Sequence, residues 1–136
     1  MGCIHSNIDS LILDMFNAEE SNDGDMLHRA IMEFDNVYNP LVDNINMYHF
    51  HHYCGKHGWR RYETRREFVI CSMMVNAVFC GRSNSVNLLR SKYPFTLKEI
   101  TSDFISDVFE SGKYNEHIIN ELLADPRVPA GNKKQL

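Results

Sequence analysis

The amino-acid sequence predicts an all-α protein, a single compact domain of six or seven helices around a buried central helix at about residues 65–80. The first observation is the run FVICSMMVNAVFC, residues 68–80, which is apolar nearly all round. The second is that apolar residues elsewhere recur at the spacing of one helix face. The third is that residues which favour helix starts and stops flank these stretches.

Two helices are predicted before residue 40. Residues 7–19 have an apolar stripe and Asn7 as a suitable N-cap. A turn at residues 19–24 follows, and the next helix has Asp23 and Asp25 near its positive N-terminus. That helix must end by Tyr38 or Asn39, since the residue before a proline disfavours the helical region. Its inward residues are Leu27, Ala30, Ile31 and Phe34.

A third helix is expected from Asn39 and Pro40, because a proline at the first helical position loses no hydrogen bond. Gly55 ends it, and a loop runs to about residue 62. Thr64 and Glu67 then have the spacing of a capping box, which starts the central helix. Length and caps favour helix over strand for residues 68–80, and Gly81 supplies a left-handed stop.

Three further helices complete the predicted domain, residues 1–126. One spans about residues 85–92, and the next starts at a second capping box, Thr96 with Glu99, and closes at Gly112. The last is capped by Asn115 and ends at Asp125-Pro126. Residues 127–136 are predicted to be a flexible polar tail.

Charge is unevenly distributed along the 136 residues, whose formal net charge is -4. Residues 1–50 contain nine acids and the single base Arg29, whereas residues 51–95 contain eight bases and two acids. The basic part could bind an anionic partner, or the two parts could pair with each other in the fold. Both interpretations remain open from the sequence.

The cysteines and the N-terminus favour a cytoplasmic protein. The four cysteines form no CxxC pair, no signal peptide is visible, and residues 68–80 are too short to span a bilayer. The start MGCIHS resembles the acylated N-termini of Src-family kinases and some G-protein α subunits, which would imply lipid on Gly2 and Cys3. No basic cluster follows, so acylation and membrane anchoring are not expected.

The stretch HFHHYCGKHGWRRYETRR, residues 49–66, carries most of the chain's distinctive chemistry. Its cations alternate with aromatic rings, a mixture that stacks on bases and neutralises phosphates. Arg65 and Arg66 occupy the first turn of the central helix, where the helix dipole disfavours positive charge, so an anionic ligand or an acid of the chain should compensate them. The candidate anion- or partner-binding residues are Lys56, His57, Trp59, Arg60, Arg61, Tyr62, Arg65 and Arg66.

The same stretch offers a zinc site as an alternative. Its nitrogen and sulfur side chains suit tetrahedral zinc, although helical spacing turns His51 away from His49 and His52. Such a site would make the chain a zinc-dependent enzyme or a zinc-stabilised domain. The candidate ligands are His49, His52, Cys54 and His57.

No sequence signature of nucleophilic or phosphate-binding catalysis is present. We therefore expect a small non-enzymatic binding or regulatory protein, a class that includes virus-encoded accessory factors, with a protein or a nucleic acid as partner and no required cofactor. A helix-groove interaction module is a further alternative. The expected layout resembles Bcl-2-like proteins, but GWRR at residues 58–61 permutes their NWGR box and no second box is found, so that family is not inferred.

Overall fold

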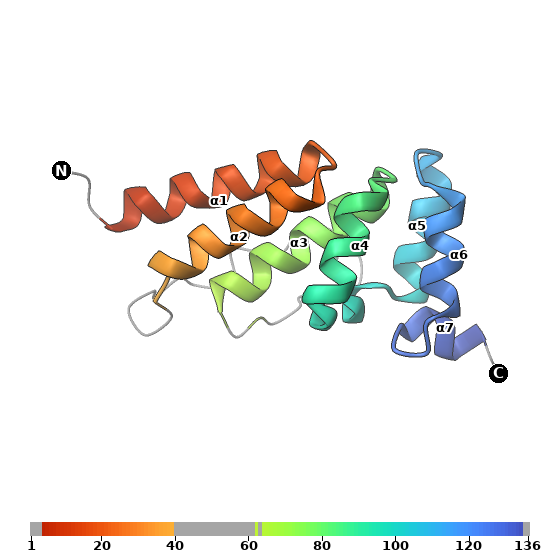
Figure 1. The fold of residues 1–136 in the computed structure, drawn as a ribbon. Helices are drawn as coiled ribbons and strands as arrows, with labels where there is room; N and C mark the ends of the chain where they lie inside the picture. Colours follow the sequence, from red (N-terminus) through yellow and green to blue (C-terminus); the bar gives the residue numbers. More distant parts are fainter. Residues whose placement is uncertain (1–3, 40–61, 63, 135–136) are drawn as a thin grey trace. The chain divides into compact units, whose positions relative to one another are not determined.

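Figure 1 presents the computed structural model, which describes residues 4–39, 62 and 64–134. These residues contain helices and no strand, so the predicted all-α fold is confirmed. The chain divides into two compact units, Met1–Val69 and Ile70–Leu136, and the boundary falls inside helix α3. The single domain over residues 1–126 stays a prediction. The helices are α1 (Ile4–Glu20), α2 (Gly24–Val37), α3 (Arg65–Phe79), α4 (Ser83–Lys92), the 3-10 helix η3 (Pro94–Glu99), α5 (Ser102–Ser111), α6 (Glu116–Ala124) and α7 (Pro129–Lys134).

In the first unit, α1 and α2 form an antiparallel helical hairpin (Figure 1). Asp23 caps α2 by accepting a hydrogen bond of 3.1 Å from the backbone N–H of Met26, as its position in the sequence predicts. The expected Asn7 cap is wrong, because α1 already begins at Ile4. A cap is worth only about 1 kcal/mol, and helix propagation can override it. The buried apolar residues of the hairpin are Ile8, Met15, Ala18, Leu27, Ile31 and Phe34.

Helix α2 ends at Val37, where the sequence places its limit. Tyr38 has extended backbone angles, φ −68° and ψ 133°, which suit the approach to Pro40. Its ring stacks on Phe34 with centroids 4.8 Å apart. The predicted third helix, from Asn39 to Gly55, and the loop after it lie outside the described residues, apart from Asn39 and Tyr62.

Helix α3 is the buried helix that the sequence predicts. Its start is capped as expected, since the backbone N–H of Glu67 donates to Thr64 Oγ1 over 3.0 Å. The residues from Val69 to Val78 are buried except Asn76. Gly81 adopts φ +71° beyond its end, and the N–H of Arg82 donates to the Ala77 carbonyl over 2.8 Å, which gives the helix a left-handed stop.

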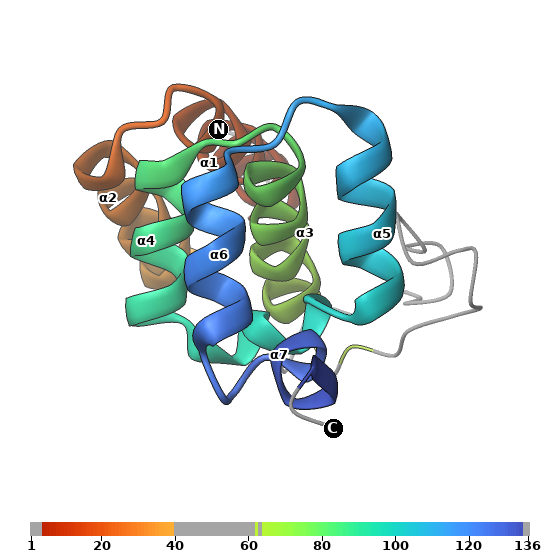
Figure 2. The same cartoon turned by 90° about the vertical axis from the view of Figure 1, so that its right-hand side faces the viewer.

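In the second unit, α4, α5 and α6 surround the part of α3 that belongs to this unit (Figure 2). Phe79 at the end of α3 contacts Phe104 of α5, with ring centroids 6.2 Å apart. Asn115 caps α6 by accepting from the N–H of Ile118, and Gly112 ends α5 with φ +72°, both as predicted. Local capping chemistry therefore sets these boundaries.

The second predicted capping box, Thr96 with Glu99, is wrong. Residues 94–99 form the 3-10 helix η3, and α5 starts at Ser102 with Thr101 as its N-cap. The Thr96 hydroxyl donates to the Tyr93 carbonyl over 2.8 Å instead of capping a helix. Thr96 and Glu99 are both buried. Their packing in the folded chain, which the local sequence pattern does not report, therefore overrides the predicted cap.

The sequence places residues 127–136 in a polar tail, but part of this segment is packed. Val128 is fully buried, and residues 129–134 form α7. The N–H of Ala130 donates to the Ile100 carbonyl over 3.1 Å, which ties α7 to the chain between η3 and α5. Pro129 occupies the first helical position, where it loses no hydrogen bond, and burial of Val128 together with this bond offsets the low helix propensity of Gly131.

Within the described ranges, no helix combines the length and the apolar character needed to cross a bilayer.

Gly81 and Gly112 provide a matched test of the turn after α3. Both have φ near +70°, but a Cβ on Gly81 would lie 3.0 Å from the Lys113 carbonyl oxygen and from the Asn115 nitrogen, whereas a Cβ on Gly112 meets nothing within 4 Å. Gly112→Ala should cost about 1–2 kcal/mol through its backbone angles alone. Gly81→Ala should cost more in urea unfolding because backbone atoms must also move, and equal losses would contradict the close approach.

Candidate functional site

Most residues of the predicted binding stretch lie outside the described residues. This holds for Lys56, His57, Trp59, Arg60 and Arg61 of the anion site. It holds equally for the zinc candidates His49, His52, Cys54 and His57, and for Gly2 and Cys3 at the N-terminus. Those assignments stay predictions. The structure does place Tyr62, Arg65 and Arg66, which form the C-terminal end of the stretch.

Arg65 and Arg66 in the first turn of α3 both form ion pairs with the hairpin. Arg65 Nη2 lies 2.9 Å from Asp9 Oδ1 of α1. Arg66 binds Asp35 of α2 with two bonds, Nε to Oδ1 at 2.7 Å and Nη2 to Oδ2 at 3.2 Å. The side chain of Arg65 is 16% exposed but that of Asp9 is 66% exposed, whereas Arg66 and Asp35 are 31% and 35% exposed, so only the second pair has both partners partly shielded from water.

These pairs compensate the positive charge at the start of α3. Two cations at a helix N-terminus oppose the helix dipole, and the two aspartates supply the compensating negative charge. Of the compensators that the sequence left open, acids of the first two helices are therefore present in the structure. A parallel pair of bonds, as between Arg66 and Asp35, also fixes the geometry of the guanidinium.

Tyr62 lies just before this turn and is buried, with 4% of its surface exposed. Its ring packs edge to face on Phe68, with centroids 5.3 Å apart. The ring of Tyr62 therefore belongs to the packing at the start of α3 and has no face open to a base or a partner. Its assignment as a partner contact is a prediction that would require this packing to open.

A groove lies on the α1–α2 hairpin. The sequence offers a helix-groove module as an alternative but does not locate a groove. Its volume is about 330 Å³, and its lining residues are Asp14, Asn17, Ala18, Met26, Arg29, Ala30 and Glu33. Of its apolar lining residues Ala18 is buried, Ala30 is half-buried and Met26 is exposed, and its polar lining residues are all exposed. Helical periodicity assigned Ala30 to the interior, so only the pairing of α1 with α2 reveals that it lines a surface.

A charged cluster in the second unit connects α4, α6 and the turn before α7. Arg90 Nη2 is 3.6 Å from Glu121 Oε1, and Glu121 Oε2 is 3.1 Å from His117 Nε2. Arg127 binds Asp125 through Nε at 3.0 Å and Nη2 at 2.7 Å. The hydrogen bonds from Arg127 lower the pKa of Asp125 from 3.8 to about 2.

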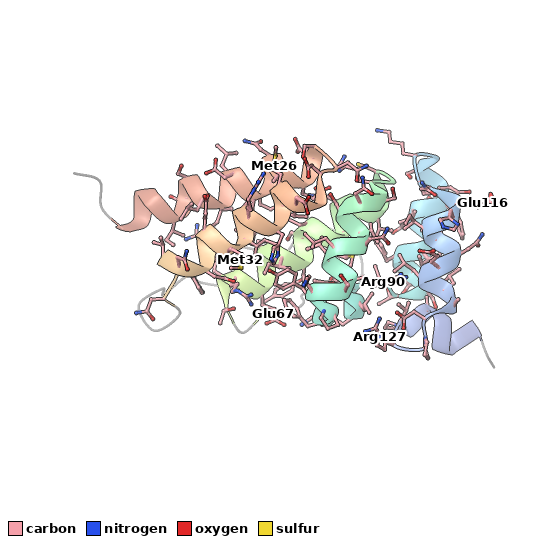
Figure 3. The ribbon with its side chains drawn as sticks, viewed as in Figure 1. Met26, Met32, Glu67, Arg90, Glu116 and Arg127 are labelled. Carbon is pink, nitrogen blue, oxygen red and sulfur yellow. The ribbon has the colours of Figure 1, made fainter. Side chains whose placement is uncertain are left out.

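The cluster is self-compensating. Both guanidinium groups, those of Arg90 and Arg127 (labelled in Figure 3), contact carboxylates. The open depression of about 490 Å³ lined by these side chains therefore has no excess charge for an anion or a cation. Because the folded pKa of Asp125 is lowered, its stabilising effect is present above its ordinary pKa and is lost as pH falls towards 2. We assign the cluster to holding the α6–α7 turn.

Among the residues that the structure describes, no group of three or more His, Cys, Asp or Glu side chains could hold a metal ion. Cys71 is buried and Cys80 is exposed, and neither forms a disulfide bond. The zinc hypothesis therefore depends on His49, His52, Cys54 and His57, outside these residues.

Comparison with known protein families, with curated proteins and with solved structures finds no match for this chain. Function is consequently argued from the residues themselves.

Tyr62→Ala tests whether Tyr62 is part of the packing or of a partner surface. Loss of a buried aromatic ring should cost about 3–5 kcal/mol in urea unfolding. The control Tyr62→Phe keeps the contact with Phe68 and should cost only about 1 kcal/mol. A loss below about 1 kcal/mol for Tyr62→Ala would contradict the burial of this ring.

Proposed function

We propose that the chain is a non-enzymatic binding protein that engages an anionic partner, an acidic protein or a nucleic acid, through the basic-aromatic segment of residues 56–61. The observation that carries this proposal is the pairing of Arg65 with Asp9 and of Arg66 with Asp35. It assigns Arg65 and Arg66 to ion pairs within the chain, and the proposal therefore places Arg60 and Arg61 against the partner.

The charge of the remainder supports an anionic partner. Residues 44–62 contain no Asp or Glu, and they include the bases Lys56, Arg60 and Arg61 together with Trp59. In a chain with more acids than bases, such a carboxylate-free stretch is a local concentration of positive charge. The aromatic ring adds a surface on which a base or another planar group can stack.

The anchoring of the segment's C-terminal end contributes to affinity. Tyr62 is buried against Phe68, and Arg65 and Arg66 are bound to the hairpin, so the chain is fixed directly after Arg61. Fixing one end of a binding segment before the partner arrives lowers the ordering entropy that binding must offset. The two ion pairs therefore support the segment without contacting the partner.

The double variant Arg60→Ala/Arg61→Ala tests the proposal against two probes, a fluorescein-labelled single-stranded oligonucleotide and a polyglutamate peptide. Binding of the favoured probe should weaken and depend less on salt, while the melting temperature stays unchanged. For single-stranded nucleic acid, loss of two phosphate contacts should reduce the slope of log K against log[salt] by about 1.4.

The matched control is Arg65→Ala/Arg66→Ala, which removes the same charge from the adjoining positions. It should lower the melting temperature and leave that salt slope close to the wild-type value at a temperature where the variant is folded. Failure of both probes to bind, or an unchanged slope in the first variant, would contradict the proposal. Stoichiometric zinc by elemental analysis would support the alternative site on His49, His52, Cys54 and His57.

A further inference from the structure

The α1–α2 hairpin combines an excess of carboxylates with an exposed apolar surface. Of the described residues, the large hydrophobic side chains that remain exposed are Leu13, Met26, Met32, Val37 and Phe109, and all but Phe109 belong to this hairpin. Residues 4–39 contain eight acids and the single base Arg29, and two of those acids, Asp9 and Asp35, pair with Arg65 and Arg66. Negative charge and apolar surface therefore occur together on one element.

Acidic and apolar side chains lie next to each other in the groove. Met26 and Ala30 lie one helical turn apart on α2, and Ala18 faces them from α1. Asp14 of α1 and Glu33 of α2 stand at the edges. The face of α2 that lines the groove continues through residue 37, where Val37 is 41% exposed, because residues 26, 30, 33 and 37 follow the helical repeat.

We propose that this groove binds a cationic amphipathic helix, with apolar side chains of the partner on Met26 and Ala30 and with its Lys or Arg side chains on Asp14 and Glu33. Charge complementarity selects the cationic partner, since the lining residues contain two acids and one base within a strongly acidic hairpin. A flexible, polarizable Met suits apolar side chains of differing shape. The mode is a helix laid in an apolar groove.

This interaction is independent of the basic segment in the proposed function. The groove and the basic segment have opposite formal charge and no residue in common, so the groove proposal does not depend on the basic segment. The length of α2 sets the scale of the partner. Fourteen residues at about 1.5 Å each give roughly 21 Å, which a helix of three to four turns would cover.

The test uses a labelled 14-residue peptide of Leu and Lys whose leucines follow the helical repeat, measured by fluorescence anisotropy. A scrambled peptide of the same composition keeps the charge and loses the apolar face, so it should bind at least tenfold more weakly. An acidic peptide, with Glu in place of Lys, should not bind. Equal binding of the ordered and scrambled peptides would overturn the proposal in favour of general charge attraction.

Met26 and Met32 provide the matched variants on the protein (Figure 3). Both are exposed on α2, at 42% and 52%, but only Met26 lines the groove, and six residues separate them by about 120° around the helix. Met26→Ser should lower the affinity for the Leu/Lys peptide at least fivefold, and Met32→Ser should leave that affinity unchanged. Equal effects would overturn the groove as the site.

Three further measurements test the role of the acids, a second copy as the occupant, and the separation from the basic segment. Asp14→Asn/Glu33→Gln should reduce both the affinity and its salt dependence, and an unchanged salt dependence would overturn the role of the two acids. Sedimentation of the unliganded protein tests a second copy as the occupant: a concentration-dependent dimer abolished by Met26→Ser would overturn the peptide proposal. Arg60→Ala/Arg61→Ala should bind the Leu/Lys peptide like the wild type, which separates this site from the basic segment.

Discussion

The start of helix α3 depends on two ion pairs that reach back to the first two helices. Arg65 and Arg66 stand where the helix dipole repels them, and Asp9 and Asp35 make that position favourable. The pairs join residues far apart in the chain, so they fix where the polypeptide returns to the hairpin after residues 40–61. They also give a structural meaning to the uneven charge, because part of the acidic half neutralises part of the basic half.

Both binding proposals follow from assigning these four charged residues to the fold. Once Arg65 and Arg66 are assigned to the fold, the positive charge left in the stretch is at Lys56, Arg60 and Arg61, next to Trp59. Once Asp9 and Asp35 are assigned to the fold, the hairpin still has carboxylates at the edges of its groove, at Asp14 and Glu33. Each surface keeps the sign of charge that its half of the sequence has, and each would select a partner of the opposite sign.

How well the sequence predicts each feature of this structure depends on how far apart in the chain the interacting residues are. Asp23, Thr64 and Asn115 cap their helices as expected, because a cap is made within three residues. The choice between Thr96 and Thr101, and the packing of Val128, depend on burial against distant residues, which local pattern cannot supply. The partners of Arg65 and Arg66 lie on other helices. The sequence therefore indicates that a counter-charge is needed, but not that Asp9 and Asp35 supply it. The groove was missed because it exists only where α1 and α2 meet.

The central claim is that Arg66 and Asp35 hold the start of α3 to the hairpin, and a double-mutant cycle measures it most directly. Urea unfolding of the wild type, Arg66→Ala, Asp35→Ala and the double variant isolates the energy of the pair from the effects of each side chain. For a two-bond pair about one-third exposed, we expect a coupling of about 0.5–1 kcal/mol that decreases at high salt. Additive losses at low salt, with no coupling, would contradict the account.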